Sequence, residues 1–388
     1  MLKKLIKPDW KNSNLNISAT LAEFLNAPNY NATLSILKEE LNKGYKNIVF
    51  ICLDGLGINP IKKNLKRKDF LRKNIIQTLT STFPSTTTNA TTSLITNKLP
   101  LEHGWLGWSL HFEEINRNID IYLHSDSQTG EKVDYVYPLA DNSDCYFDHA
   151  KTDYEIVDVM PEYCKTKTEN RINVENEKEL FGEILNVCKR EGKHFIYSYN
   201  PEPDATMHEY GVTSKQAKEK ICFINEEIEK LYNKLEDTLV IITADHGQID
   251  VKGYTEFYKD KELNDMLECV PYLDARTPAF IVKKGMEQEF EVKFNKKYGK
   301  DFKLFKTEDL IEQNYFGERG NYGKILGDYI AVGTYTHKQF ISYENMPRFK
   351  GHHTSLTEEM LVPLILLKKG EWKCKRELMK LLVTQRKN

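Results

Sequence analysis

Three short segments of the chain are continuously apolar, and an aspartate follows each of them. They are NIVFIC (47–52), followed by Asp54, HFIYSY (194–199), followed by Asp204, and TLVIITA (238–244), followed by Asp245. Apolar runs without polar alternation are typical of strands buried on both faces, as in a parallel sheet. The three runs therefore predict the buried centre of an α/β fold.

The segment between the second and third runs predicts an amphipathic helix. Ser214 stands at the expected N-cap, and apolar residues recur at helical spacing at Ile221, Ile224, Ile228, Leu231 and Leu235. A strand, helix and strand in this order form a βαβ unit, whose crossover makes the two strands parallel. Because ligands bind beyond the carboxyl ends of parallel strands, the three aspartates should face one crevice.

We therefore expect one α/β domain over residues 1–388, with a mostly parallel central sheet and helices on both faces. Two segments, 109–190 and 253–345, carry many Tyr, Lys and Glu residues with weak periodicity. We expect them to leave the sheet and to form a cap over the crevice.

Charge and composition exclude several classes of protein. The chain has 55 Lys and Arg against 57 Asp and Glu, so its net charge does not indicate a nucleic-acid or membrane surface. The longest apolar runs are too short to span a bilayer, and the N-terminal lysines precede no apolar stretch of a secretory signal. Seven cysteines without CxxC pairs fit reduced thiols, so we expect a cytoplasmic protein. The oligomeric state stays open.

Candidate metal ligands gather in short motifs near the predicted strand ends. The motifs are an aspartate and a histidine four residues apart, an Asp-His-Gly tripeptide, and a late pair of histidines. With the first aspartate, the candidates are Asp54, Asp204, His208, Asp245, His246, His352 and His353. Each residue alone is more typical of a turn or a packed side chain. Together they match the mixed oxygen and nitrogen donors of two-metal phosphoryl-transfer sites.

A hydroxyl-rich segment, TSTFPSTTTNATTSLIT (80–96), contains the candidate nucleophile. A hydroxyl at the start of a helix lies near free backbone N–H groups and the positive end of the helix dipole, which also suit phosphate oxygens. On composition alone, however, a capping turn rich in Ser and Thr is the better explanation.

An ordered set of motifs resembles the alkaline phosphatase superfamily, and most closely its nucleotide pyrophosphatase/phosphodiesterase (type I phosphodiesterase) branch. The motifs are LDGLG (53–57), FPSTTTNATTSLITNKLPLEHG (83–104), EPDATMHEYG (202–211), ADHG (244–247) and GHHTSLT (351–357). The resemblance covers roughly residues 45–110, 190–250 and 345–370, and is weak across the two irregular segments.

The resemblance implies a role for each matching position. Thr87 matches the nucleophile, with Thr86 and Thr88 as neighbouring alternatives. The implied ligands of one divalent metal ion are Asp204, His208 and His353, and those of the other are Asp54, Asp245, His246 and the Thr87 oxygen. The pattern Gly-x-His selects His353 over His352, which is retained as a residue supporting the ligands. Zinc is the expected metal, with manganese as the alternative.

The sequence departs from the branch at two places that concern the substrate. Thr88 replaces the aromatic residue that often follows the nucleophile, and Trp108 stands where an asparagine commonly binds a phosphate oxygen. Because Trp108, Leu110 and Phe112 alternate as one face of a strand, packing in the core is the favoured interpretation of Trp108. The candidates for substrate binding are Asn89, Trp108 and Tyr210.

The function implied is hydrolysis of a phosphodiester or nucleotide pyrophosphate bond through a phospho-threonine. The expected substrate is a small phosphate ester, in the first place a nucleotide derivative. The alternatives are a phosphomonoesterase or phosphomutase of the same superfamily, or a non-catalytic metal-binding module.

Overall fold

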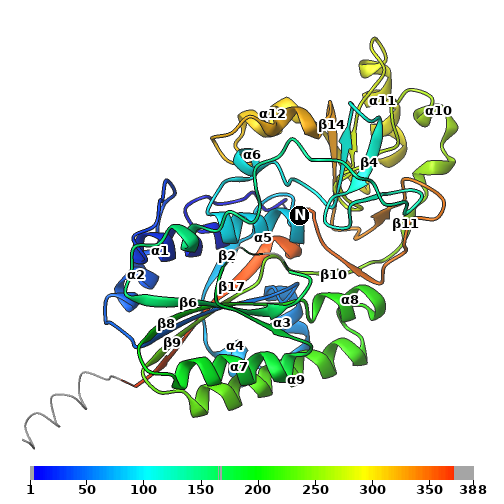
Figure 1. The fold of residues 1–388 in the computed structure, drawn as a ribbon. Coiled ribbons are helices and arrows are strands. Elements are labelled where there is room, and N and C mark those ends of the chain that lie inside the picture. The colour runs from blue at the N-terminus through cyan, green and yellow to red at the C-terminus, as the bar shows by residue number, and fades with distance from the viewer. Residues whose placement is uncertain (1–3, 165, 167, 371–388) are drawn as a thin grey trace, which may run out of the picture.

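A seven-stranded sheet forms the centre of the protein (Figure 1). The computed structural model describes residues 4–164, 166 and 168–370. In spatial order, the strands are β2 (Ile75–Thr80), β17 (Leu361–Lys369), β9 (Thr238–Thr243), β1 (Asn47–Leu53), β8 (Lys193–Asn200), β6 (Tyr154–Pro161) and β7 (Arg171–Val174). Strand β17 runs antiparallel to both of its neighbours, and the other pairs are parallel. The expected mostly parallel α/β sheet is confirmed.

The three predicted strands lie side by side at the middle of this sheet. Strand β1 pairs with β8 on one side and with β9 on the other, and every residue of β1 and β9 is buried. The crossover from β8 to β9 therefore passes over β1. Because all three strands run in the same direction, their carboxyl ends meet at one edge of the sheet.

Helices cover both faces of the sheet (Figure 1). One face carries α3 (Ile58–Asn64), α4 (Phe70–Lys73), α7 (Glu177–Lys189) and α9 (Lys215–Lys234), and the other carries α1 (Asn14–Phe24), α2 (Ser35–Leu41) and α5 (Thr87–Thr96). The predicted helix is α9. Its N-cap Ser214 accepts a hydrogen bond of 3.0 Å from the backbone N–H of Ala217, and its predicted apolar positions are buried.

Smaller sheets and helices form an outer lobe beyond the carboxyl edge of the central sheet (Figure 1). Its elements are α6 (Pro100–His103), β3 (Ser109–Phe112), β4 (Arg117–Asp120), β5 (Ser125–Asp126), β11 (Tyr254–Thr255), η2 (Phe257–Lys259), α10 (Lys261–Asn264), β12 (Ala279–Phe280), α11 (Glu287–Tyr298), β13 (Phe302–Lys306), α12 (Thr307–Glu312), η3 (Tyr322–Leu326), β14 (Tyr329–Gly333) and β15 (Gln339–Phe340). The lobe has apolar clusters of its own, one of them built mainly from phenylalanines.

Short elements connect the outer lobe with the sheet. They are η1 (Tyr146–His149), α8 (Asp204–Tyr210), β10 (Ile249–Asp250), β16 (Gly351–His352) and η4 (Glu358–Met360). A fully buried ion pair of 3.0 Å between Arg276 of the outer lobe and Glu359 of η4 joins the two parts.

The expected excursion over residues 109–190 is too long. Only its first part, with β3, β4 and β5, lies in the outer lobe, whereas β6, β7 and α7 belong to the layers of the central sheet. Strand β7 is the last strand of the sheet and β6 lies next to it, and several residues of both strands are partly exposed. Polar residues therefore interrupt their apolar pattern, and the signal of a buried strand is weak.

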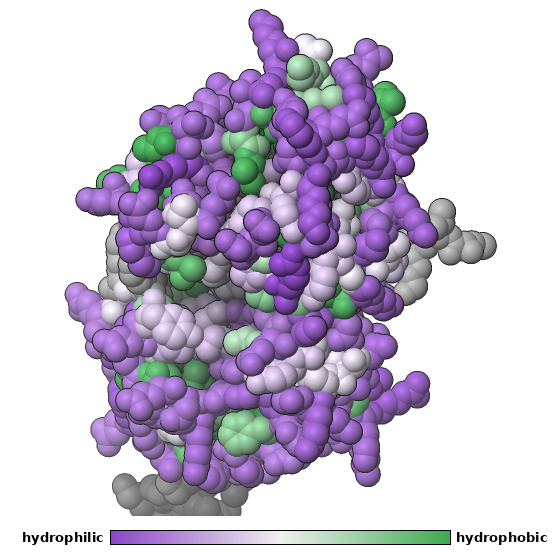
Figure 2. Space-filling view, turned by 90° about the vertical axis from the view of Figure 1, so that its right-hand side faces the viewer, coloured by the Kyte–Doolittle hydropathy of each residue, from purple (hydrophilic) through white to green (hydrophobic). Residues whose placement is uncertain are grey.

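The face of the molecule drawn in Figure 2 is mainly hydrophilic, and its hydrophobic residues form small separate patches. The exposed large hydrophobic residues are likewise scattered along the chain, from Tyr30 to Val292. Within the described residues, no helix combines the length and the apolar character needed to cross a membrane.

Candidate active site

The three strand-end aspartates converge at the carboxyl edge of the sheet, as predicted. Asp54 follows β1, Asp245 follows β9, and Asp204 begins α8 after β8. The Nε2 atom of His246 lies 3.3 Å from Asp54 Oδ1 and 3.4 Å from Asp245 Oδ2. Asp204 Oδ2 lies 3.2 Å from His208 Nε2, one helical turn along α8. All three carboxylates are buried.

Hydrogen bonds fix one oxygen of each carboxylate. The backbone N–H groups of His246 and Gly55 donate to Asp245 Oδ1 at 2.8 and 3.1 Å. The Tyr199 hydroxyl donates to Asp54 Oδ2, and the Gln248 amide donates to Asp204 Oδ1. Asp54 Oδ1 and Asp245 Oδ2 are buried without a hydrogen-bond partner among the described residues. These two oxygens keep lone pairs that a cation can accept.

Three histidines are oriented in the same way. The Nδ1 atoms of His208, His246 and His353 lie 2.9, 3.0 and 3.0 Å from the backbone carbonyls of Gly351, Gly247 and Ser85. A proton on Nδ1 that is donated to a carbonyl leaves the lone pair on Nε2. Metal-binding histidines are commonly held by such hydrogen bonds.

The electrostatics of the cluster also fit divalent cations. Burial and the neighbouring Asp245 and Asp204 raise the pKa of Asp54 well above its ordinary value, because several negative charges share one dry site. Burial and the neighbouring His246 lower the pKa of His353 well below its ordinary value, which keeps this imidazole neutral. Crowded carboxylates beside neutral imidazoles are stabilised when a cation is shared among them.

The donor atoms form three overlapping groups in which they lie within 4.8 Å of one another. The groups are Asp54, Asp245 and His246; Asp204, His246 and His353; and His208, His352 and His353. The first group is the set of protein ligands expected for one metal. The other two divide the expected Asp204, His208 and His353 between them, and they add His246 and His352. The structure thus brings the six expected ligands together, and their binding of metal stays a prediction.

Thr87 is the hydroxyl that faces this cluster. It is the first residue of α5, and its Oγ1 lies 3.2 Å from His246 Nε2 and 3.4 Å from Asp54 Oδ2. Thr86 instead donates a hydrogen bond of 3.1 Å to Asp274 Oδ2, and Thr88 is fully buried. The geometry therefore favours Thr87 over both neighbouring alternatives.

The three candidates for substrate binding lie apart from the donor atoms. The amide of Asn89 is buried and donates to the Pro84 carbonyl at 2.8 Å, so it supports the loop before α5. Tyr210 is 44% exposed at the end of α8, and its hydroxyl lies beside Glu209. Their binding of substrate stays a prediction.

The packing of Trp108 differs from its favoured interpretation. Leu110 and Phe112 are buried in the outer lobe as expected, but Trp108 precedes β3 and is only partly buried. Its ring lies 6.4 Å from that of Tyr122, whose hydroxyl is bonded to Thr91 of α5 at 3.0 Å. Trp108 thus belongs to the contact between the outer lobe and the helix of Thr87, not to the apolar core.

Four further residues contact the cluster, namely Tyr199, Gln248, Asp274 and His352. The sequence predicts a supporting role for His352 and no functional role for the other three. Tyr199 and Gln248 hold carboxylates, and Asp274 lies 3.4 Å from His352 Nε2 through its Oδ1 atom. Tyr199 ends the run HFIYSY, and Gln248 directly follows the Asp-His-Gly motif. Their closeness to these two signals could have marked them as neighbours of the site. Asp274 comes from the outer lobe, and no local pattern marks it.

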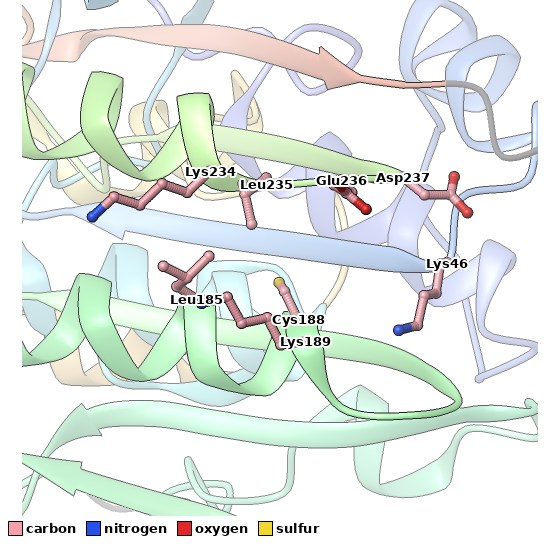
Figure 3. Close-up of a pocket in the computed structure, with 8 residues that line it drawn as sticks. All are labelled: Lys46, Leu185, Cys188, Lys189, Lys234, Leu235, Glu236 and Asp237. Atoms are coloured by element: carbon pink, nitrogen blue, oxygen red, sulfur yellow. The ribbon is translucent and has the colours of Figure 1, made fainter.

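A separate pocket of about 380 Å³ lies at the opposite, amino-terminal edge of the sheet (Figure 3). Its lining mixes both charges and consists of Lys46, Leu185, Cys188, Lys189, Lys234, Leu235, Glu236 and Asp237. None of these residues belongs to the cluster of aspartates and histidines.

Comparison with solved structures shows the same fold in a nucleotide pyrophosphatase/phosphodiesterase and in a phosphonoacetate hydrolase. Murine ectonucleotide pyrophosphatase/phosphodiesterase 5, an inactive threonine-to-alanine variant in complex with AMP, is 16% identical with a TM-score of 0.60, covering 84% of this chain and 88% of that chain. Phosphonoacetate hydrolase from Sinorhizobium meliloti 1021, in complex with phosphonoformate, is 14% identical with a TM-score of 0.58. The match covers 83% of this chain and 89% of that chain. No curated protein matches the sequence significantly.

The match to a sequence family places the chain in the class of phosphoester hydrolases. Within this class, the sequence model of the type I phosphodiesterase/nucleotide pyrophosphatase family matches residues 48–355. The chain belongs to this family, as its motifs indicated. The family is metal-dependent, and the clustered donors of the chain are candidate metal ligands.

Gly55 provides a direct test of how closely the carboxylates are packed. Its φ is +69°, and a Cβ atom there would lie 2.7 Å from Asp204 Oδ1. Gly44 has a similar φ of +74° but no atom within 4 Å of such a Cβ, so it is the matched control. We expect Gly55→Ala to lower the free energy of unfolding by about 1–3 kcal/mol more than Gly44→Ala does, as overpacking does in cores. If urea unfolding shows that both variants lose the same free energy of unfolding, the close packing at Gly55 is contradicted.

Proposed function

We propose that the protein hydrolyses phosphodiester or nucleotide pyrophosphate bonds, with Thr87 as the nucleophile and two divalent ions held by the six aspartates and histidines. The observation that carries this proposal is the position of Thr87 Oγ1, 3.2 Å from His246 Nε2 at the edge of the donor cluster. No other threonine of the hydroxyl-rich turn combines this contact with partial exposure.

The position of Thr87 beside the donor cluster is compatible with in-line displacement at phosphorus. Thr87 Oγ1 would form a bond to phosphorus while the bond to the leaving oxygen breaks, and water would then release the phosphate from Thr87. The first backbone N–H groups of α5 have no partners within the helix and would donate to the phosphate oxygens, where the helix dipole also favours negative charge. Two bound divalent cations would supply neutralisation of the phosphoryl oxygens and favour the deprotonated hydroxyl.

The ligands of the structurally similar proteins support a small phosphorus-containing substrate. AMP is bound by the ectonucleotide pyrophosphatase/phosphodiesterase, in a variant made inactive by a threonine-to-alanine change. Phosphonoformate is bound by the phosphonoacetate hydrolase. Zinc is the metal proposed, because His and Asp donors suit it. We also propose that the protein is cytoplasmic.

The contacts of Arg276 and Arg117, two arginines of the outer lobe, favour a diester over a monoester. Arg276 is fully buried, bonded to Glu359 at 3.0 Å and to the Lys338 carbonyl at 2.9 Å. Arg117 pairs with Glu131 on the surface. Neither is therefore available for the additional negative charge of a monoester dianion, which Arg side chains commonly bind.

The role of the nucleophile is tested by Thr87→Ala and Thr87→Ser. We expect Thr87→Ala to abolish the phospho-enzyme while two metal ions remain bound, because the Asp and His ligands are unchanged. Thr87→Ser should keep partial activity, since it retains a hydroxyl. Trapping with a labelled substrate and peptide mapping locates the phosphate, and Thr88→Val is the control. A phosphate on Thr86 or Thr88 would show that the wrong hydroxyl has been chosen.

The ligands are tested by His208→Ala and Asp245→Ala. Each variant should lose one metal ion, measured by elemental analysis after dialysis, and turnover should fall by about 100-fold or more because two-metal assistance is lost. The exposed His149 and Asp153 provide the control substitutions His149→Ala and Asp153→Ala. Two ions and a near-normal rate in either ligand variant would refute the assignment.

The substrate preference is tested with p-nitrophenyl esters. We expect bis-p-nitrophenyl phosphate to show a kcat/KM about tenfold above that of p-nitrophenyl phosphate, a difference of about 1.4 kcal/mol in transition-state binding. The measurement is made at saturating metal. A clear preference for the monoester would instead favour the phosphomonoesterase or phosphomutase alternative.

A further inference from the structure

His352 lies in the wall of the donor cluster but has no role in the ligand set implied by the family. It is 4% exposed, and neither of its ring nitrogens makes a hydrogen bond with another described residue. Its ring centroid lies 5.1 Å from that of His208 and 4.9 Å from that of His353. A buried imidazole without hydrogen bonds is costly unless another partner binds it.

The backbone holds His352 against α8. His352 pairs with Ile249 in the short ladder of β10 and β16. At Gly351, a Cβ atom would lie 2.5 Å from the Met207 carbonyl, so only glycine allows this approach. The ring of Phe349 packs on both His208 and His352, with centroids 4.5 and 5.0 Å away. The position of His352 is therefore set by packing on several sides.

Asp274 of the outer lobe lies beside this imidazole. Its Oδ1 accepts from the Ala275 N–H at 2.7 Å and lies 3.4 Å from His352 Nε2, while its Oδ2 accepts from Thr86 at 3.1 Å. A carboxylate behind one nitrogen of a histidine leaves the other nitrogen for a metal, as in carboxylate–histidine–zinc arrangements. In His352 the remaining nitrogen is Nδ1.

We propose that His352, oriented by Asp274, is an additional ligand of the metal ion expected at His208 and His353. This inference rests on the proposed function, and it makes the outer lobe part of the metal centre. Asp274 acts through His352 and is a positioning residue. Its hydrogen bond from Thr86 links the same carboxylate to the N-cap of the helix that begins with Thr87.

The test is metal binding by the purified full-length protein, independent of turnover. Zinc affinity is measured by competition with a chelating dye, and cobalt substitution reports the ligand field through visible absorption. We expect His352→Gln and Asp274→Asn each to weaken binding of one of the two ions by about 10–100-fold and to change the cobalt spectrum. His111 and Asp126 are two separate buried residues of the same lobe, and the control substitutions His111→Gln and Asp126→Asn should leave the zinc affinity and the cobalt spectrum unchanged.

A double variant separates positioning from direct binding. Because Asp274 acts through His352, Asp274→Asn should weaken metal binding little further when His352→Gln is already present. Thermal unfolding of the metal-free variants checks that they fold, and His352→Asn replaces His352→Gln if the latter does not. Unchanged zinc affinity and cobalt spectrum in folded variants, or a change in KM alone, would overturn the inference.

The same measurements separate this inference from the proposed function. A wild-type protein that binds no metal, or hydrolyses none of the p-nitrophenyl esters, contradicts the proposed function. A wild-type protein that binds two ions and is active, with folded His352 variants of unaltered affinity, contradicts only the additional ligand.

Discussion

The crowding of three buried carboxylates at one edge of the sheet is the constraint around which the rest of the site is organised. Asp54, Asp204 and Asp245 each follow a strand of the same direction, and none of them can be solvated by bulk water. Burial of unpaired charge is costly, so the surroundings must supply hydrogen bonds and positive charge. The Tyr199 hydroxyl and the Gln248 amide donate hydrogen bonds to two of the carboxylates. The oxygens Asp54 Oδ1 and Asp245 Oδ2, which have no hydrogen-bond partner among the described residues, can bind a positive charge.

Backbone carbonyl groups orient three of the histidines. Carbonyl groups of Gly351, Gly247 and Ser85 each face the Nδ1 atom of one histidine, so three Nε2 atoms point into the same region. These carbonyls come from loops that are far apart in the chain. The geometry of the site therefore depends on the packing of whole elements, and a substitution at a distance that shifts one loop can misplace a ligand.

The outer lobe is joined to the site by buried polar contacts. The ion pair of Arg276 and Glu359 connects the lobe to the segment that leads into β17. Asp274, two residues before Arg276, contacts both His352 and Thr86. Tyr122 adds a bond to Thr91 of the same helix. The lobe thus contacts the helix of Thr87 at its N-cap and again one turn further on.

The sequence by itself determined the centre of the fold and the family, and it predicted the residues of the site. Strands β1, β8 and β9 were predicted because burial on both faces produces unbroken apolar runs, and the three aspartates were predicted to converge because they follow those strands. The histidines were predicted from their motifs and from the family resemblance. Strands β6 and β7 were missed because, near the edge of the sheet, partly exposed polar residues interrupt their apolar pattern. Trp108, in a regular alternation, lies outside the core because β3 begins one residue later. Only the tertiary structure brought Asp274 and His352 together, since their contact joins segments whose local patterns carry no information about each other.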